Sequence, residues 1–147
     1  MKHLSVAVIA LGFLISSHST SIGANTIANS VDELVKRCTY ALADGADLNW
    51  AQGFEAGECI GWITGISKSM HQQCAIADAH PSIPLTPDHR DYARLQGHDP
   101  KGYSNGALVR IVVKYAEENP ERWKLGPYYM TTEALRKAAP CPPKKAD

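Results

Sequence analysis

The sequence GFEAGECIGWITGISKSM at residues 53–70 decides the fold of this chain. Its apolar side chains recur at intervals of three and four residues, which is the period of an α-helix with one apolar face. The residues of this face are Cys59, Ile63, Ile66 and Met70. We therefore predict a helix from about Asn49 to Met70, with this face in the core.

Four glycines fall on a second face of the same segment. Gly53, Gly57, Gly61 and Gly65 recur every four residues and so form one stripe along the helix, here called the glycine stripe. A glycine costs about 1 kcal/mol relative to alanine in a helix interior, so we expect something to approach this backbone closely. Tight packing against another helix of the same domain is the favoured interpretation, and a dimer interface or a partner groove is the alternative. A membrane span is excluded because charged residues interrupt the segment: Glu55, Glu58 and Lys68.

Three further helices are predicted on either side of this one. The first opens at Ser30, where Glu33 completes a capping box, and ends at residues 44–45. Another runs from about Asn105 to Glu118 and stops before Pro120, and the last runs from near Pro127 to before Pro140. The expected core residues of the first helix are Val31, Leu34, Val35, Cys38, Ala41 and Leu42. Those of the helix at residues 105–118 are Leu108, Ile111, Val112 and Tyr115. No stretch alternates apolar and polar residues, so the predicted fold is all-α, a small bundle of four to five helices.

The N-terminal segment is typical of a secretory signal peptide. Lys2 and His3 precede an apolar run from residue 4 to residue 15, and small and polar residues follow it. The run is shorter than the roughly 20 residues that a membrane span needs. We expect residues 1–24 to be a signal peptide, cleaved after Ala24, and residues 25–147 to be a single helical domain.

Four cysteines in an exported chain are expected to form two disulfides, for which three pairings exist. The first two predicted helices are joined by a short loop and should pack antiparallel. Cys38 before that loop and Cys59 after it then come close to each other, which leaves Cys74 to pair with Cys141. Each bridge should stabilise the fold by roughly 3 to 4 kcal/mol on a chain-entropy model. Because the chain lacks a Cys-x-x-Cys pair, zinc binding by the thiols is the weaker interpretation.

Several segments occur in a characteristic order: the signal peptide with a cysteine in the first helix, GECIGWITG at residues 57–65, NGALVRIVVKY at residues 105–115, Asn119-Pro120-Glu121, Ala134-Leu135 and Ala139-Pro140-Cys141. Together they resemble the Rap/Tai family of type VI secretion immunity proteins. The resemblance implies a small, helical, disulfide-bonded periplasmic protein that is often a homodimer. It also implies a protein toxin as partner, a peptidoglycan amidase whose active-site cleft the immunity protein blocks.

The sequence departs from the family pattern at residues 75–104, which form a long insertion after Cys74. Within it, Thr86-Pro87-Asp88 is typical of a helix start, and Gly97 of a stop. Insertions of this length are usually functional or disordered. We therefore expect partner binding here, through charged and aromatic side chains: Asp88, His89, Arg90, Asp91, Tyr92 and Arg94. The alternative is a loop that only covers one end of the bundle.

Composition and the remaining polar residues argue against other classes of function. The chain has 15 basic and 15 acidic residues and no basic cluster, so neither nucleic acid nor a membrane surface is expected as a partner. Histidines recur every nine residues, at His71, His80, His89 and His98; this interval matches no helical ligand spacing, and surface positions are favoured over a metal site. We expect no catalytic residue, no metal and no cofactor. A periplasmic chaperone-like protein and a small-ligand-binding helical protein are the alternative functions.

Overall fold

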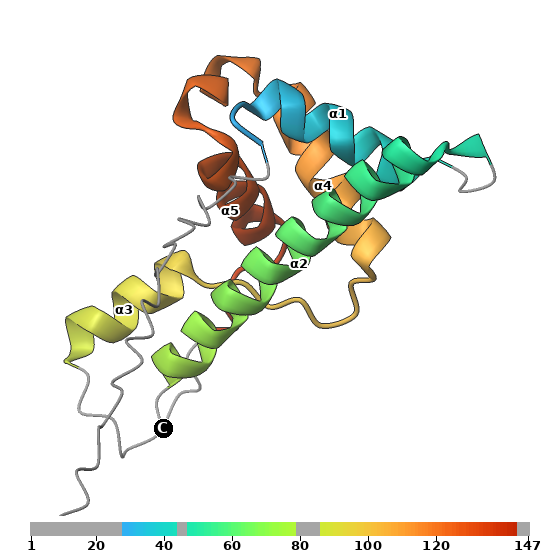
Figure 1. The fold of residues 1–147 in the computed structure, drawn as a ribbon. Helices are drawn as coiled ribbons and strands as arrows, with labels where there is room; N and C mark the ends of the chain where they lie inside the picture. Colours follow the sequence, from blue (N-terminus) through green and yellow to red (C-terminus); the bar gives the residue numbers. More distant parts are fainter. Residues whose placement is uncertain (1–27, 44–46, 79–85, 144–147) are drawn as a thin grey trace, which may run out of the picture.

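The computed structural model describes residues 28–43, 47–78 and 86–143. These residues form five α-helices and one 3-10 helix: α1 (Val31–Leu42), α2 (Trp50–Asp78), α3 (Pro87–Gln96), α4 (Asn105–Glu118), η2 (Pro120–Leu125) and α5 (Pro127–Ala138) (Figure 1). The described ranges contain no strand, and the all-α prediction is confirmed. The expected signal peptide at residues 1–24 lies outside the described residues.

The helix boundaries follow the caps in the sequence, with one correction. Ser30 caps α1, and its hydroxyl accepts a hydrogen bond from the Glu33 amide at 3.2 Å. Helix α4 has the predicted bounds and is capped in the same way by Ser104. However, α2 continues to Asp78 instead of ending near Met70, because no glycine or proline interrupts residues 71–78. The first residues of the insertion at 75–104 are therefore the last turn of α2.

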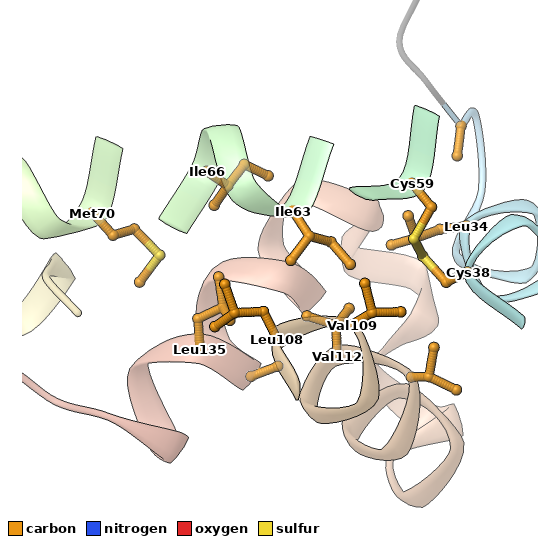
Figure 2. Packing of buried hydrophobic residues seen from close by; sticks show 13 residues of the cluster. Leu34, Cys38, Cys59, Ile63, Ile66, Met70, Leu108, Val109, Val112 and Leu135 are labelled. Atoms are coloured by element: carbon orange, nitrogen blue, oxygen red, sulfur yellow. A yellow bond between two sulfur atoms is a disulfide. The ribbon is translucent and has the colours of Figure 1, made fainter. Parts of the chain in front are cut away.

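The core lies on one side of α2, against α1, α4 and α5. Apolar side chains of α2 point toward those of α4 and α5 (Figure 2). Ile63 of α2, Val109 of α4 and Leu135 of α5 are completely buried, as is Leu34 of α1. Burial of a side chain of this size contributes about 1.5 to 3 kcal/mol, so these contacts dominate the stability of the bundle.

Two disulfides connect elements that are distant in the sequence. Cys38–Cys59 joins α1 to α2, with the Cα atoms 5.2 Å apart, and Cys74–Cys141 joins α2 to the segment after α5, with the Cα atoms 5.4 Å apart. These are the pairs that the helix register favours. No free cysteine remains among the described residues.

The glycine stripe does not pack against another helix of the domain, so the favoured interpretation of Gly53, Gly57, Gly61 and Gly65 is wrong. All four glycines are exposed, and a Cβ atom added to any of them would meet no neighbouring atom within 4 Å. The reason is that α2 makes its core contacts through the face of Cys59 and Ile63, and the glycines lie away from that face.

A different glycine provides the close approach. Gly97 is buried directly after α3, beside the disulfide between Cys74 and Cys141. A Cβ atom at this position would lie 2.5 Å from Cys74 Sγ and even closer to Cys141 Sγ. Its φ angle of −83° is open to any residue, so the need for glycine at this position is steric.

We expect Gly97→Ala to destabilise the protein by about 1 to 3 kcal/mol, because the added methyl group overpacks the disulfide. Urea unfolding measures the loss, and peptide mapping measures the fraction of Cys74–Cys141 that has formed. The matched control is Gly57→Ala, which adds the same methyl group to open space and should stabilise α2 by up to about 1 kcal/mol. Equal stability of the Gly97 variant and the parent would contradict the close contact.

Candidate partner-binding surface

Helix α3 forms from the insertion because both of its ends are specified locally. The Thr86 hydroxyl accepts a hydrogen bond from the His89 amide at 3.4 Å, and Pro87 occupies the first helical position. The helix ends at Gln96, before Gly97. The expected start and stop of this helix are therefore present, and α3 lies along the C-terminal part of α2 (Figure 1).

Three polar contacts attach α3 and the segment after it to the rest of the domain. Arg94 forms an ion pair with Asp78 at the end of α2 and donates to the Pro142 carbonyl oxygen. The Asp99 amide donates to the Ala139 carbonyl oxygen at 2.8 Å. The insertion is therefore fixed to both α2 and the segment that follows α5.

His98 provides the buried part of this attachment, which corrects the expectation that it is a surface residue. The ring has no exposed area. Its Nδ1 faces the carbonyl oxygens of Leu135 at 3.0 Å and Ala139 at 3.2 Å, so Nδ1 carries the proton and donates. Its Nε2 is then the acceptor, and the Ser67 hydroxyl donates to it at 3.2 Å. The neutral ring thus links α2 to the end of α5.

The structure separates the six predicted contact residues into two groups. Asp88, His89, Asp91 and Tyr92 are exposed on the outer side of α3, and 65% of Tyr92 is accessible. Arg90 is partly buried. Arg94 is only 17% exposed and is engaged inside the chain, so we replace its expected role in partner contact with the structural one described above.

A groove between α3 and α5 adjoins this helix and was not predicted from the sequence. It has a volume of ≈ 320 Å³ and is lined by side chains from the end of α3 and from α5: Leu95, Gln96, Tyr128, Tyr129, Thr132, Glu133 and Arg136. Leu95, Tyr128 and Tyr129 are unusually exposed for their size, at 62%, 58% and 43%. The only sequence signal was the adjacent tyrosine pair at the start of the last helix.

Buried charge lies under one side of this groove. The Glu133 side chain is only 8% exposed and forms an ion pair with Arg122 of η2; Lys137 lies 3.9 Å from the same oxygen. Burial alone would raise the pKa of Glu133, but the hydrogen bond from Arg122 and the nearby positive charges outweigh it and lower the pKa. Glu133 is therefore ionised at neutral pH and already neutralised within the chain.

Metal binding and membrane insertion receive no support from the described ranges. Within them, no three His, Cys, Asp or Glu side chains lie close enough together to hold a metal ion. His71 and His89 are exposed, and His80 lies outside the described residues. Among the described helices, none combines the length and the apolar character that crossing a bilayer requires.

These features define a disulfide-bonded helical domain in which the outer helix and the adjoining groove are held in place by a disulfide and a buried histidine. A family model for Rap1a immunity proteins matches residues 30–141. The chain therefore belongs to the Rap1a immunity protein family. Membership gives it a role in immunity to type VI effectors and a toxin as its partner. Comparisons with curated proteins and with solved structures gave no match.

We expect the stability of the protein to fall below neutral pH because of His98. Burial lowers the pKa of this ring below 6.5, although its hydrogen bonds to Ala139 and Leu135 act in the opposite direction. The unfolded chain then binds a proton at a higher pH than the folded chain does. The free energy of unfolding should therefore be constant above about pH 7.5 and fall as the pH decreases toward the folded-state pKa, by at most about 1.4 kcal/mol per pH unit.

Urea unfolding between pH 5 and pH 8 measures this slope. The variant His98→Asn keeps a donor toward the two carbonyl oxygens but does not titrate in this range. The difference in unfolding free energy between parent and variant reports His98, because His71 and His89 are the same in both proteins. A difference that does not change with pH would contradict the assignment. Glu133 contributes in a separate pH range. Because its pKa is lowered, the stability that it supplies is lost only as the pH falls below 4.5.

Proposed function

We propose that this protein is a periplasmic immunity protein that binds and blocks a type VI-secreted peptidoglycan amidase. The observation that carries the proposal is the family match over residues 30–141, which covers the whole described bundle including α3. The amidase as target is supported by the resemblance of residues 57–65 and 105–115 to Rap/Tai proteins. Inhibition by binding alone is consistent with the cysteines, because Cys38, Cys59, Cys74 and Cys141 are all in disulfides and supply no thiol nucleophile.

Export to the periplasm is supported by two independent features. Residues 1–24 have the order of a basic start, an apolar run and a small-residue region that signal peptides have. The two disulfides require an oxidising compartment in order to form and persist. The periplasm is such a compartment, and it is also where a peptidoglycan amidase finds its substrate.

We assign toxin contact to the outer side of α3, at Asp88, His89, Asp91 and Tyr92, together with Leu95 at the edge of the groove. Tyrosine is among the residues that contribute most to protein interfaces, and a large apolar side chain left exposed beside it favours burial by a partner. The helix is fixed at its C-terminal end by Arg94, Gly97 and His98. Little conformational entropy is then lost when the toxin binds.

We expect the double variant Tyr92→Ala/Leu95→Ala to bind the toxin at least about 10-fold more weakly, since both side chains would lose their burial against the partner. The probe is a purified type VI-secreted peptidoglycan amidase, the class of toxin that the proposed function names. Calorimetry measures the affinity, and survival of cells that export the amidase to their periplasm measures protection. These point substitutions are preferable to shortening the insertion, because shortening removes His98 and disturbs the fold.

The matched control for this test is Leu125→Ala on η2, which truncates a 46% exposed apolar side chain elsewhere and should leave affinity unchanged. A double variant that binds with parental affinity would place recognition on another surface. A parent protein that neither binds nor inhibits the amidase would contradict the proposed function itself.

We also propose that the protein is a homodimer that associates through the exposed face of α2. This face carries the glycine stripe and, at its N-terminal end, Trp50 and Phe54, which are 84% and 58% exposed. Their rings stack with centroids 5.9 Å apart. Large aromatic side chains beside a bare helix backbone suit a second helix at short distance, and a two-fold interface uses the same patch on both copies.

We expect Gly61→Leu to weaken dimerisation without destabilising the monomer. A Cβ atom at this position meets no atom within 4 Å in the monomer, whereas a leucine side chain would separate two helices that pack on this face. Sedimentation over a range of concentrations measures association, and urea unfolding measures stability. Gly106→Leu, the same change at a glycine of α4 where an added Cβ atom also meets nothing within 4 Å, is the control. Unchanged association of Gly61→Leu would exclude the stripe as the interface, and a parent that stays monomeric would exclude the dimer.

A further inference from the structure

The groove between α3 and α5 contains a cationic side chain that has no partner. Arg136 is half-buried in the lining, yet it forms no ion pair and no hydrogen bond with any residue that the structure describes. Glu133, one turn earlier on α5, does not neutralise it, because that carboxylate is already paired with Arg122 and has Lys137 beside it. A guanidinium without a partner inside the chain keeps its N–H donors available to a ligand.

The charges around the groove favour an anionic ligand. Arg122, Lys137 and Arg136 contribute three positive charges on this side of the molecule. Against them stand the buried Glu133 and the exposed Glu121, which lies 3.9 Å from Arg122. One positive charge therefore remains in excess. The part of α3 that lines the groove, Leu95 and Gln96, brings no charge.

We propose that this groove binds an acidic side chain of the toxin, with the Arg136 guanidinium donating to its carboxylate. The inference rests on the proposed function and adds the chemistry of one contact to it. A guanidinium presents its N–H donors in a planar fork that matches a carboxylate, and the pair is strongest when water is partly excluded. Leu95, Tyr128 and Tyr129 supply that exclusion, because their exposed apolar surface lies in or beside the same groove. The volume of ≈ 320 Å³ is large enough for an Asp or Glu side chain.

The first test measures the affinity of the same purified amidase for Arg136→Met, which keeps an unbranched apolar side chain but removes the charge. We expect binding at least about 10-fold weaker than that of the parent, and a weaker dependence of affinity on salt. Arg136→Lys should recover part of the loss, since it restores the charge without the planar fork. The control is Arg110→Met, which changes the net charge equally at an exposed position of α4 and should have little effect. Circular dichroism and urea unfolding establish that each variant is folded.

The outcomes separate this inference from the proposed function. An amidase that binds the parent and Arg136→Met equally would overturn the inference and leave the proposed function intact. Should the parent fail to bind the amidase, the groove is tested with the peptide acetyl-Ala-Glu-Ala-amide, and its neutral counterpart acetyl-Ala-Gln-Ala-amide is the control. We then expect the acidic peptide alone to shift the Arg136 Nε–H signal in NMR spectra. No shift, or equal shifts with both peptides, would overturn the carboxylate site.

Discussion

Helix α2 buries only one of its sides, and α1, α4 and α5 pack against that side. Ile63 and Met70 are almost completely buried against α1, α4 and α5, while Gly61 and Gly65 on the same helix are exposed. Burial of the apolar side supplies the main stabilising free energy of the bundle, as in most helical domains. The N-terminal part of α2 is joined to α1 by Cys38–Cys59, and the C-terminal part carries α3. One helix therefore serves as the common support of the core and of the proposed binding surface.

The outer helix α3 has no buried residue of its own, so its position depends on its packing along α2 and on contacts at its C-terminal end. Gly97 allows the chain to pass directly beside the Cys74–Cys141 bridge, and His98 then enters the interior to reach the carbonyl oxygens at the end of α5. Arg94 attaches α3 to the end of α2 through its ion pair with Asp78. A surface helix of ten residues is only marginally stable in isolation. These contacts are what allow it to present Tyr92 and Leu95 in a fixed arrangement.

Local sequence signals predict the helices well, whereas the residues that lie beside each surface are known only from the structure. Ser30, Thr86 and Pro127 mark helix starts through contacts within a few residues, and the predictions that rest on them agree with the structure. The glycine stripe and Gly97 show the opposite case. The same residue type is exposed on α2 and closely packed beside the disulfide, because its surroundings come from segments distant in the sequence. The burial of His98 and the groove with Arg136 likewise depend on segments distant in the sequence, so local signals do not predict them.

The Cys74–Cys141 bridge also connects the proposed binding surface to the compartment in which it would work. The bridge contacts Gly97 and holds the chain after α5 against α2, and this is the chain to which Asp99 and Arg94 attach through Ala139 and Pro142. On the proposed function, the thiols stay unpaired in the reducing cytosol before export, and the segment after α5, to which α3 attaches, lacks its covalent link to α2. On the proposed function, the surface is therefore completed only after export. The amidase proposed as target has its substrate in that same compartment, so under this proposal the inhibitor would acquire its binding form where the toxin acts.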